Sequence, residues 1–153
     1  MEERLDYSSA SPRAMAILLE QERYLQARFN DSDSMTLKIW ELVKLRVSQI
    51  NGCAYCIDMH SKDALALGES PERLFGLAAW SDTPFYSETE REALAWAELI
   101  NSGKPVSDAC YQRALKYFGS QGIVDLTMAI NAISSWNRIA KAFKPTVGSY
   151  SPG

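Results

Sequence analysis

Histidine is almost absent from this sequence, which contains only His60, and cysteine is scarce, with three residues. Long apolar runs are also missing. No stretch approaches the roughly 18 uninterrupted apolar residues of a membrane-spanning helix. The first residues, MEERLDYSSASP, contain no apolar segment typical of a secretory signal. We therefore expect a soluble cytoplasmic protein that does not enter a membrane.

A surplus of positive charge is lacking as well. The 16 lysines and arginines are scattered among 19 acidic residues, which gives a formal net charge of −3. Without a cationic face to neutralise a phosphate backbone, nucleic acid is not an expected partner. No glycine-rich phosphate loop is present, so we expect no bound dinucleotide or flavin cofactor.

The composition fits one folded domain. With 153 residues, of which 46% are apolar, the chain can bury a single core. We therefore predict a single domain over residues 1–153. Its last segment, 144–153, is expected to be a loose tail or to pack on a neighbour.

Turn-forming residues divide the chain into segments rich in Ala, Leu, Glu, Lys and Met. Ser11, which precedes a proline, and Ser87, paired with Glu90 in a capping box, are typical helix starts. Gly68 and Gly119 are typical helix ends. The segments are therefore predicted to be helices at 12–28, 34–50, 53–67, 71–80, 88–101, 107–118 and 121–142. An all-α bundle of about six to seven helices follows.

One segment is ambiguous. The residues VKLRVSQI at 43–50 alternate between apolar and polar over the first six positions, as a strand does. A strand that leads into Cys-x-x-Cys and a helix would be thioredoxin-like. A thioredoxin-type sheet needs further β-rich segments, however, and the other segments have helical spacing. We therefore favour the helix.

The chemistry of the chain is concentrated in the stretch NGCAYCIDMH. Cys53 and Cys56 are three residues apart, and His60 follows four residues later. In a helix that begins at Gly52 or Cys53, a turn of about 100° per residue places the three side chains within about 60° of one another. They share the stripe that faces the core, so the site is predicted to be partly buried.

A position in the first helical turn favours the thiolate, because free backbone N–H groups and the positive end of the dipole stabilise negative charge. The spacing of three also allows the two sulfurs to form a disulfide after one is oxidised. His60, one turn further on, can carry protons. The pattern therefore favours a two-thiol redox cycle.

Glu41 is the second candidate group. The segment around it is apolar on nearly all sides, so the carboxylate should lose contact with water. Burial would raise its pKa and make it a proton acceptor near neutral pH, provided that it has a partner. An ion pair with Lys38 or Lys44 on the same helix is the structural alternative.

Other readings of these residues remain open. Cys110 could join Cys53, Cys56 and His60 in a structural zinc site, although it lies in a distant segment. The simpler interpretation makes Cys110 a core residue, with Val106 and Phe118 at helical spacing. Asn137 and Arg138 are interpreted as structural or interfacial residues without a catalytic role.

The full pattern resembles a known family. Glu41, eleven residues, Cys53, two residues, Cys56, three residues and His60 are similar to the core motif of the alkylhydroperoxidase D-like (AhpD-like) branch of the carboxymuconolactone decarboxylase family. The surrounding ELVKLRVSQINGCAYCIDMHSKDALALGES resembles the family throughout, and NAISSWNRIAKAF near the C-terminus resembles its final helix.

The resemblance implies an AhpD-like helical bundle that assembles into homo-oligomers, trimers or hexamers, and a peroxidase activity that needs no metal or cofactor. It implies that Cys56 attacks the hydroperoxide and that Cys53 is the resolving thiol. Glu41 and His60 would be the proton-relay residues. Electrons would come from an external dithiol, either lipoyl-bearing or thioredoxin-like.

The sequence departs from the family at one point and leaves a second function open. The best-known peroxidase of the family has a further histidine inside the Cys-x-x-Cys, where this chain has Ala54 and Tyr55. The family's decarboxylases lack the cysteine pair, which argues against lactone decarboxylation here. The alternative function is a non-catalytic redox sensor or assembly module that uses the same two cysteines.

Overall fold

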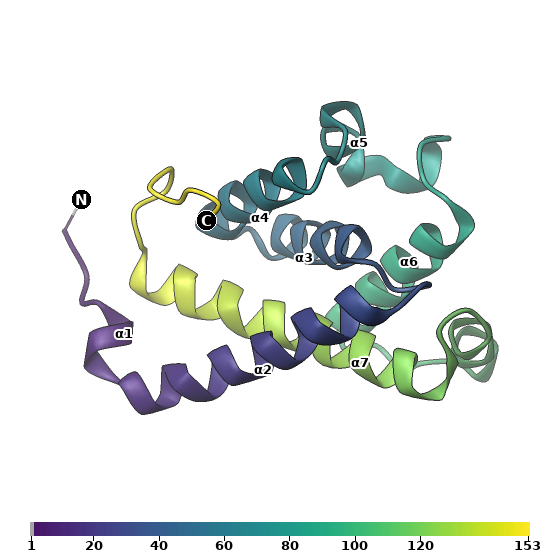
Figure 1. Ribbon diagram of the computed structural model, residues 1–153, viewed down its shortest axis with the longest axis horizontal. Helices are drawn as coiled ribbons and strands as arrows, with labels where there is room; N and C mark the ends of the chain where they lie inside the picture. The colour runs from purple at the N-terminus through teal and green to yellow at the C-terminus, as the bar shows by residue number, and fades with distance from the viewer. Residues whose placement is uncertain (1) are drawn as a thin grey trace.

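The computed structural model describes residues 2–153 and consists of helices and connecting segments over that range (Figure 1). In chain order the helices are α1 (Tyr7–Ala10), α2 (Pro12–Asp31), α3 (Leu37–Asn51), α4 (Ala54–Ala66), α5 (Pro71–Phe75), the 3₁₀ helix η1 (Leu77–Asp82), α6 (Glu88–Ser102) and α7 (Asp108–Phe143). The all-α prediction is confirmed.

Helix α3 occupies the centre of the bundle. It contacts α4, α6 and α7 as well as α2, and Figure 1 shows it enclosed by these elements. The segment with strand-like alternation is therefore a helix. Its residues Val43, Leu45 and Val47 are all buried, on different sides of α3, because neighbours surround the helix. The favoured interpretation is confirmed, and the alternation has no structural meaning.

Helix ends follow the local signals closely. The side chain of Ser87 accepts a hydrogen bond from the backbone of Glu90, whose side chain bonds back to Ser87, so the predicted capping box is present. Gly119 has a left-handed φ of 72° at the predicted break. The next helix begins at once, so the two predicted segments form one kinked element, α7. The predicted helix 71–80 is divided into α5 and η1 at Gly76.

The short helix α1 has no counterpart in the prediction. Asp6 caps it by accepting a hydrogen bond from the backbone N–H of Ser8 at 3.0 Å. A single turn of four residues is too short to show any periodicity, which is why the sequence gives no signal there. The segment lies beside the far end of α7 (Figure 1).

Hydrophobic side chains form two main cores, and a third, small cluster joins Cys53 and Cys56 to Ala140. The larger core lies between α2, α3, α6 and α7, where Phe29 stacks on Trp40 with ring centroids 5.4 Å apart. The smaller core joins α3 and α4 to α5 and η1 through residues such as Leu42 and Leu77. None of the helices within residues 2–153 has the length and hydropathy needed to span a bilayer.

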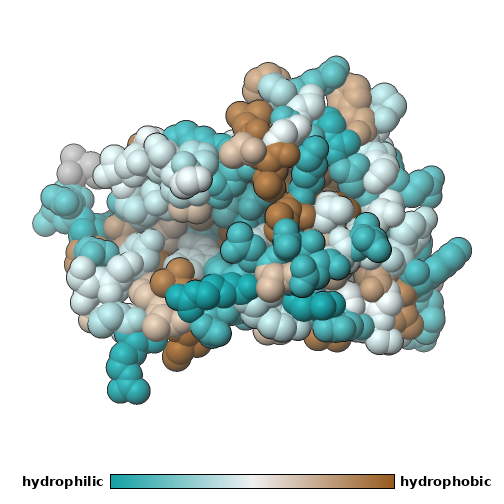
Figure 2. Space-filling model, in the orientation of Figure 1, coloured by the Kyte–Doolittle hydropathy of each residue, from teal (hydrophilic) through white to brown (hydrophobic). Residues whose placement is uncertain are grey.

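Some hydrophobic side chains remain in contact with water. On the face shown in Figure 2 they appear in separate groups among hydrophilic residues, near the junction of α4 and α5 and along α2. Exposed members of these elements include Ile17, Leu65 and Phe75. Small scattered groups of this kind are normal on a protein surface.

Asn137 joins α7 to α3 inside the protein. It is fully buried, its amide nitrogen donates to the Ser48 hydroxyl at 3.0 Å, and its amide oxygen accepts from Asn51 at 3.0 Å. The structural role expected for this residue is therefore the observed one.

Replacing Asn137 by alanine should lower the free energy of unfolding by about 1–3 kcal/mol, because Ser48 and Asn51 would each lose a buried partner. Urea unfolding followed by circular dichroism measures the change. Asn30→Ala, at an exposed position of α2, is the control and should have little effect. Equal unfolding midpoints for the two variants would contradict this account.

Candidate active site

The turn between α3 and α4 fixes the position of the cysteine pair. Gly52 ends α3 in the left-handed conformation, with φ 69°, which a residue with a Cβ adopts at a cost. The N–H of Gly52 bonds to the carbonyl of Gln49, and that of Cys53 bonds to the carbonyl of Ser48 at 3.1 Å. This is a Schellman ending. The next helix therefore begins immediately.

Cys53 is the N-cap of α4, and its sulfur accepts the backbone N–H of Cys56 at 3.3 Å. The two cysteines form a disulfide, and their Cα atoms are 5.3 Å apart. Both side chains are almost fully buried. The expectation that the two sulfurs can reach each other at the start of one inward-facing helix is confirmed. When reduced, they lie where a helix N-terminus favours the thiolate.

His60 meets Glu41 across the α3–α4 interface. The Nδ1 atom of His60 lies 3.0 Å from a carboxylate oxygen of Glu41, and both side chains are buried. An ionised carboxylate only accepts hydrogen bonds, so the proton of this bond belongs to Nδ1. In the neutral imidazole Nε2 is therefore free to accept a proton. The partner of Glu41 is thus His60, and not the cysteine pair.

Lys44 binds the other oxygen of the same carboxylate. Its ammonium nitrogen lies 2.6 Å from Glu41 and 3.5 Å from the centroid of the Trp40 ring. The ion pair within α3, considered as an alternative to a functional role, is therefore present together with the histidine contact. Lys44 is itself 5% exposed, and these two contacts compensate for the burial of its ammonium group.

The pKa of Glu41 is lowered, and not raised as expected from the sequence. Burial is the largest single influence and raises the pKa of the carboxyl. The hydrogen bond from His60 and the positive charge of Lys44 together outweigh it, so the pKa lies below its usual value of 4.5. Glu41 is therefore a carboxylate at neutral pH. It orients and polarises His60, and it is not itself a proton acceptor near pH 7.

The C-terminal segment completes this cluster. The Tyr150 hydroxyl donates to Asp63 at 2.6 Å, and Lys62 donates to the carbonyl of Tyr150 at 3.0 Å. Asp63 in turn lies 3.9 Å from His60. Burial and the bond to Asp63 raise the pKa of the Tyr150 phenol. Residues 144–153, expected either to be loose or to pack on a neighbour, are attached to α4 of the same chain through Tyr150. No pattern in the sequence of residues 144–153 predicts this contact.

Ligand atoms of Glu41, His60 and Asp63 lie within 4.8 Å of one another. Lys44 already neutralises Glu41, and Nδ1 of His60 is already bonded, so the group is best described as a hydrogen-bonded cluster. Among residues 2–153 it does not extend to Cys110.

Cys110 itself lies in the first turn of α7 and is half-buried, and its neighbour Val106 is exposed. The prediction that Cys110 is a core residue is wrong, because this turn lies at the edge of the bundle. The zinc arrangement is not supported either, since Cys53 and Cys56 are bonded to each other.

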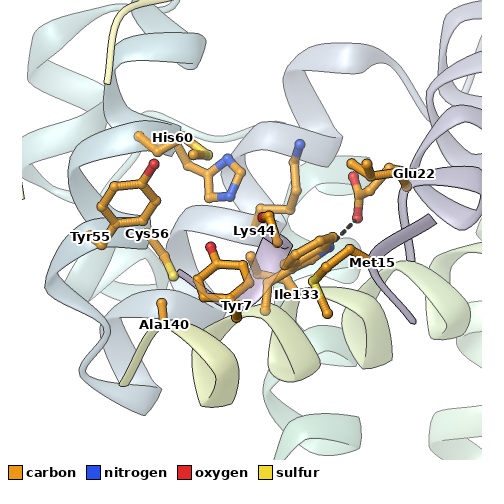
Figure 3. Close-up of a pocket in the computed structure, with 13 residues that line it drawn as sticks. Tyr7, Met15, Glu22, Lys44, Tyr55, Cys56, His60, Ile133 and Ala140 are labelled. Atoms are coloured by element: carbon orange, nitrogen blue, oxygen red, sulfur yellow. Dashed lines mark hydrogen bonds between the residues drawn. The ribbon is translucent and has the colours of Figure 1, made fainter. Parts of the chain in front are cut away.

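A cavity of about 310 Å³ opens beside Cys56 (Figure 3). Its polar and ionisable lining consists of Ser8, Glu22, Lys44, Cys56 and His60, and the other walls come from α1, α2, α4 and α7. The apolar and aromatic lining includes Tyr7, Met15, Leu19, Tyr55, Met59, Ile133, Trp136 and Ala140. Cys53 does not line this cavity. It borders a separate, more open groove together with Lys141 and Lys144.

The comparisons with known proteins agree with this geometry. A family model described as the carboxymuconolactone decarboxylase family matches residues 19–99, which is more than half of the chain and includes Glu41 and the Cys-x-x-Cys. The chain belongs to the carboxymuconolactone decarboxylase family. The match begins in α2 and ends within α6.

Relatives in the family extend the similarity over almost the whole chain. The uncharacterized protein YdfG of Bacillus subtilis is 40% identical over 144 residues, covering 93% of this chain and 95% of YdfG. A crystal structure from Agrobacterium tumefaciens, of a protein of unknown function proposed as an antioxidant defence protein AhpD, has a TM-score of 0.83. It is 34% identical, and the match covers 99% of both chains. The fold is therefore AhpD-like.

A more distant structure shares the fold alone. The debrominase Bmp8 superposes with a TM-score of 0.78 at 18% identity, covering 92% of this chain and 74% of Bmp8. The fold is therefore shared with a debrominase, and the reaction of this chain has to be argued from its own site.

The lowered pKa of Glu41 has a consequence for stability. Its interactions stabilise the folded protein fully above the unfolded-state value, near 4.5, and are lost as the pH falls through the lower folded-state value. Glu41→Gln should therefore be less stable than the wild type at pH 7, and the difference should shrink as the pH is lowered below about 4. Urea unfolding from pH 7 to 3 measures both.

The charge-matched control is Glu72→Gln, at an exposed position of α5, which should follow the wild-type curve. A gap between wild type and Glu41→Gln that stays constant with pH would show that the carboxylate charge is not what stabilises the cluster.

Proposed function

We propose that the protein is a thiol-dependent peroxidase that reduces hydroperoxides through a Cys53–Cys56 disulfide cycle. One observation carries the proposal: the bonded cysteine pair lies at the N-terminus of α4, and Cys56 shares an apolar cavity with His60. A reactive thiol, a proton acceptor and a space for an organic molecule are thus combined in one place.

The geometry supports different roles for the two cysteines. Cys56 lines the cavity and is the thiol that a hydroperoxide bound there would meet. Cys53 lies outside the cavity, at the N-cap, and is suited to resolve the oxidised Cys56. His60 takes the thiol proton through Nε2, and Glu41 is a positioning residue that holds His60.

The cycle balances without a cofactor. The Cys56 thiolate attacks the outer oxygen of the hydroperoxide, the O–O bond breaks, and an alcohol leaves while a sulfenic acid forms. The Cys53 thiol condenses with the sulfenic acid and releases water, which closes the disulfide. An external dithiol then reduces the disulfide by two exchange steps and is itself oxidised.

Several partners belong to this proposal. The dithiol is expected to be lipoyl-bearing or thioredoxin-like, and the groove beside Cys53, with Lys141 and Lys144 at its edge, offers a second approach to the disulfide. A cytoplasmic location and assembly into a trimer or hexamer remain parts of the proposal. A reducing compartment suits a disulfide that must be reopened in each cycle.

The cysteine roles predict opposite outcomes for two variants. Cys56→Ser should lower hydroperoxide turnover by more than about a thousandfold, because the attacking thiol is lost. Cys53→Ser should still react once and hold a sulfenic acid that dimedone labels on Cys56. Mass spectrometry locates the label. Cys110→Ser is the matched control and should keep wild-type turnover, since Cys110 lies outside the site. Dimedone on Cys53 in the Cys56→Ser variant would reverse the assigned roles.

Catalysis and sensing can be separated by turnover. Supplied with dihydrolipoamide, a peroxidase consumes many equivalents of tert-butyl hydroperoxide per chain. A redox sensor oxidises once, and its sedimentation then changes. We expect sustained consumption and unchanged sedimentation, because the Cys53–Cys56 bond is local to one turn of α4 and joins no distant elements. A single equivalent consumed, with altered sedimentation, would favour the sensor.

A further inference from the structure

The N-terminal segment forms one wall of the cavity beside Cys56. It is held to the end of α7, where Arg4 donates to the carbonyl of Ala142 and the Tyr7 ring lies 5.7 Å from that of Phe143. Asp6 fixes the first turn of α1 through hydrogen bonds from Ser8 and Ser9. Tyr7 is thereby presented to the cavity from a segment outside the 19–99 family match.

The Tyr7 side chain is placed to donate a hydrogen bond to a substrate that binds in the cavity. In Figure 3 its ring lies beside Cys56, and its hydroxyl is directed toward the side of the cavity where His60 stands. Within residues 2–153 this hydroxyl has no hydrogen-bond partner, whereas Glu22 and Lys44 in the same lining are engaged by Trp136 and Glu41. A phenol facing a cavity without a partner has its proton available for a ligand.

The protonation state of Tyr7 suits this role. Burial, and secondarily the nearby Tyr55, raise the pKa of the phenol above its usual value of 10.0. Tyr7 is therefore a neutral donor at neutral pH. The Tyr55 hydroxyl also lacks a partner within the described chain, but in Figure 3 it is directed away from the Cys56 sulfur.

We propose that Tyr7 is a further catalytic residue, which donates its hydroxyl proton to the oxygen that leaves when Cys56 attacks a hydroperoxide. The inference rests on the proposed peroxidase function. When the thiolate attacks the outer oxygen, the O–H group stays on sulfur and the electron pair of the broken O–O bond goes to the alkoxide. The alkoxide takes the proton from Tyr7 and leaves as an alcohol, and the phenolate regains a proton from water. Sulfur is oxidised and the peroxide is reduced.

With this role, the loss of the Tyr7 hydroxyl should slow the oxidation of Cys56 to an extent that depends on the leaving group of the oxidant. An alkoxide is strongly basic and needs a proton as it departs, whereas the carboxylate released from a peracid is a stable anion. Tyr7→Phe keeps the ring against Phe143 and removes only the hydroxyl. The reduced protein should therefore react more slowly with tert-butyl hydroperoxide, by about ten- to a hundredfold, and at nearly the wild-type rate with peracetic acid.

The measurement is a single-turnover reaction of the reduced protein, quenched with an alkylating reagent and followed by mass spectrometry as loss of the Cys53 and Cys56 thiols. Tyr111→Phe, an exposed tyrosine on α7, is the control and should match the wild type with both oxidants. A normal rate with peracetic acid also shows that the Tyr7→Phe site is intact.

Two results would overturn the role of Tyr7 alone: a wild-type rate of Tyr7→Phe with tert-butyl hydroperoxide, or an equal slowing with both oxidants, which indicates a merely structural effect. A wild-type protein that does not react with tert-butyl hydroperoxide would instead overturn the peroxidase function, and this inference with it.

Discussion

The hydrogen bond between Glu41 and His60 is the contact on which the site depends. A carboxylate buried between two helices costs several kcal/mol in desolvation unless charges and hydrogen bonds compensate it. Here His60 takes one oxygen and Lys44 takes the other, and the Trp40 ring covers the lysine. Each member is tolerated in the interior only because the others are present. Because these buried groups need one another in the folded protein, they hold His60 in one orientation, facing the cavity.

The turn at Gly52 supplies the second constraint. Because α3 ends in a Schellman motif, the chain reverses within two residues and α4 returns alongside α3. This return brings His60, two turns into α4, to the level of Glu41 on α3. The cysteines then occupy the start of α4, where the helix dipole favours the thiolate. The spacing between the glutamate, the cysteines and the histidine is thus a consequence of one turn and two helices in contact.

Structural features that depend only on residues nearby in the chain can be predicted from the sequence. Helical spacing, the Ser87 capping box and the shared stripe of Cys53, Cys56 and His60 are local properties, and the structure confirms them. The pKa of Glu41 is not local. Burial alone raises it, and the hydrogen bond from His60, 19 residues away in the sequence, reverses the direction together with the charge of Lys44.

Cys110 shows the same limit. Helical spacing to Phe118 describes one face of α7, but not whether another helix covers that face at its first turn. The contacts of Tyr7 and Tyr150 are harder still to predict from the sequence. Tyr150, in the C-terminal segment, bonds to α4 more than 80 residues away. Tyr7, in the N-terminal segment, lines a cavity between four other helices.

Both terminal segments contribute residues to the surroundings of His60. Residues near Tyr7 wall the cavity on the Cys56 side, while Tyr150 covers Asp63 on the other side. The proposed reaction with a hydroperoxide needs an open approach to Cys56, whereas the ion pair of Glu41 with Lys44 is strongest when water is excluded. The structure combines the two: Cys56 lines a cavity, whereas Glu41 is almost fully buried with Lys44 paired to it. The two terminal segments therefore contribute to the surroundings of a site whose motif lies in α3, α4 and the turn between them.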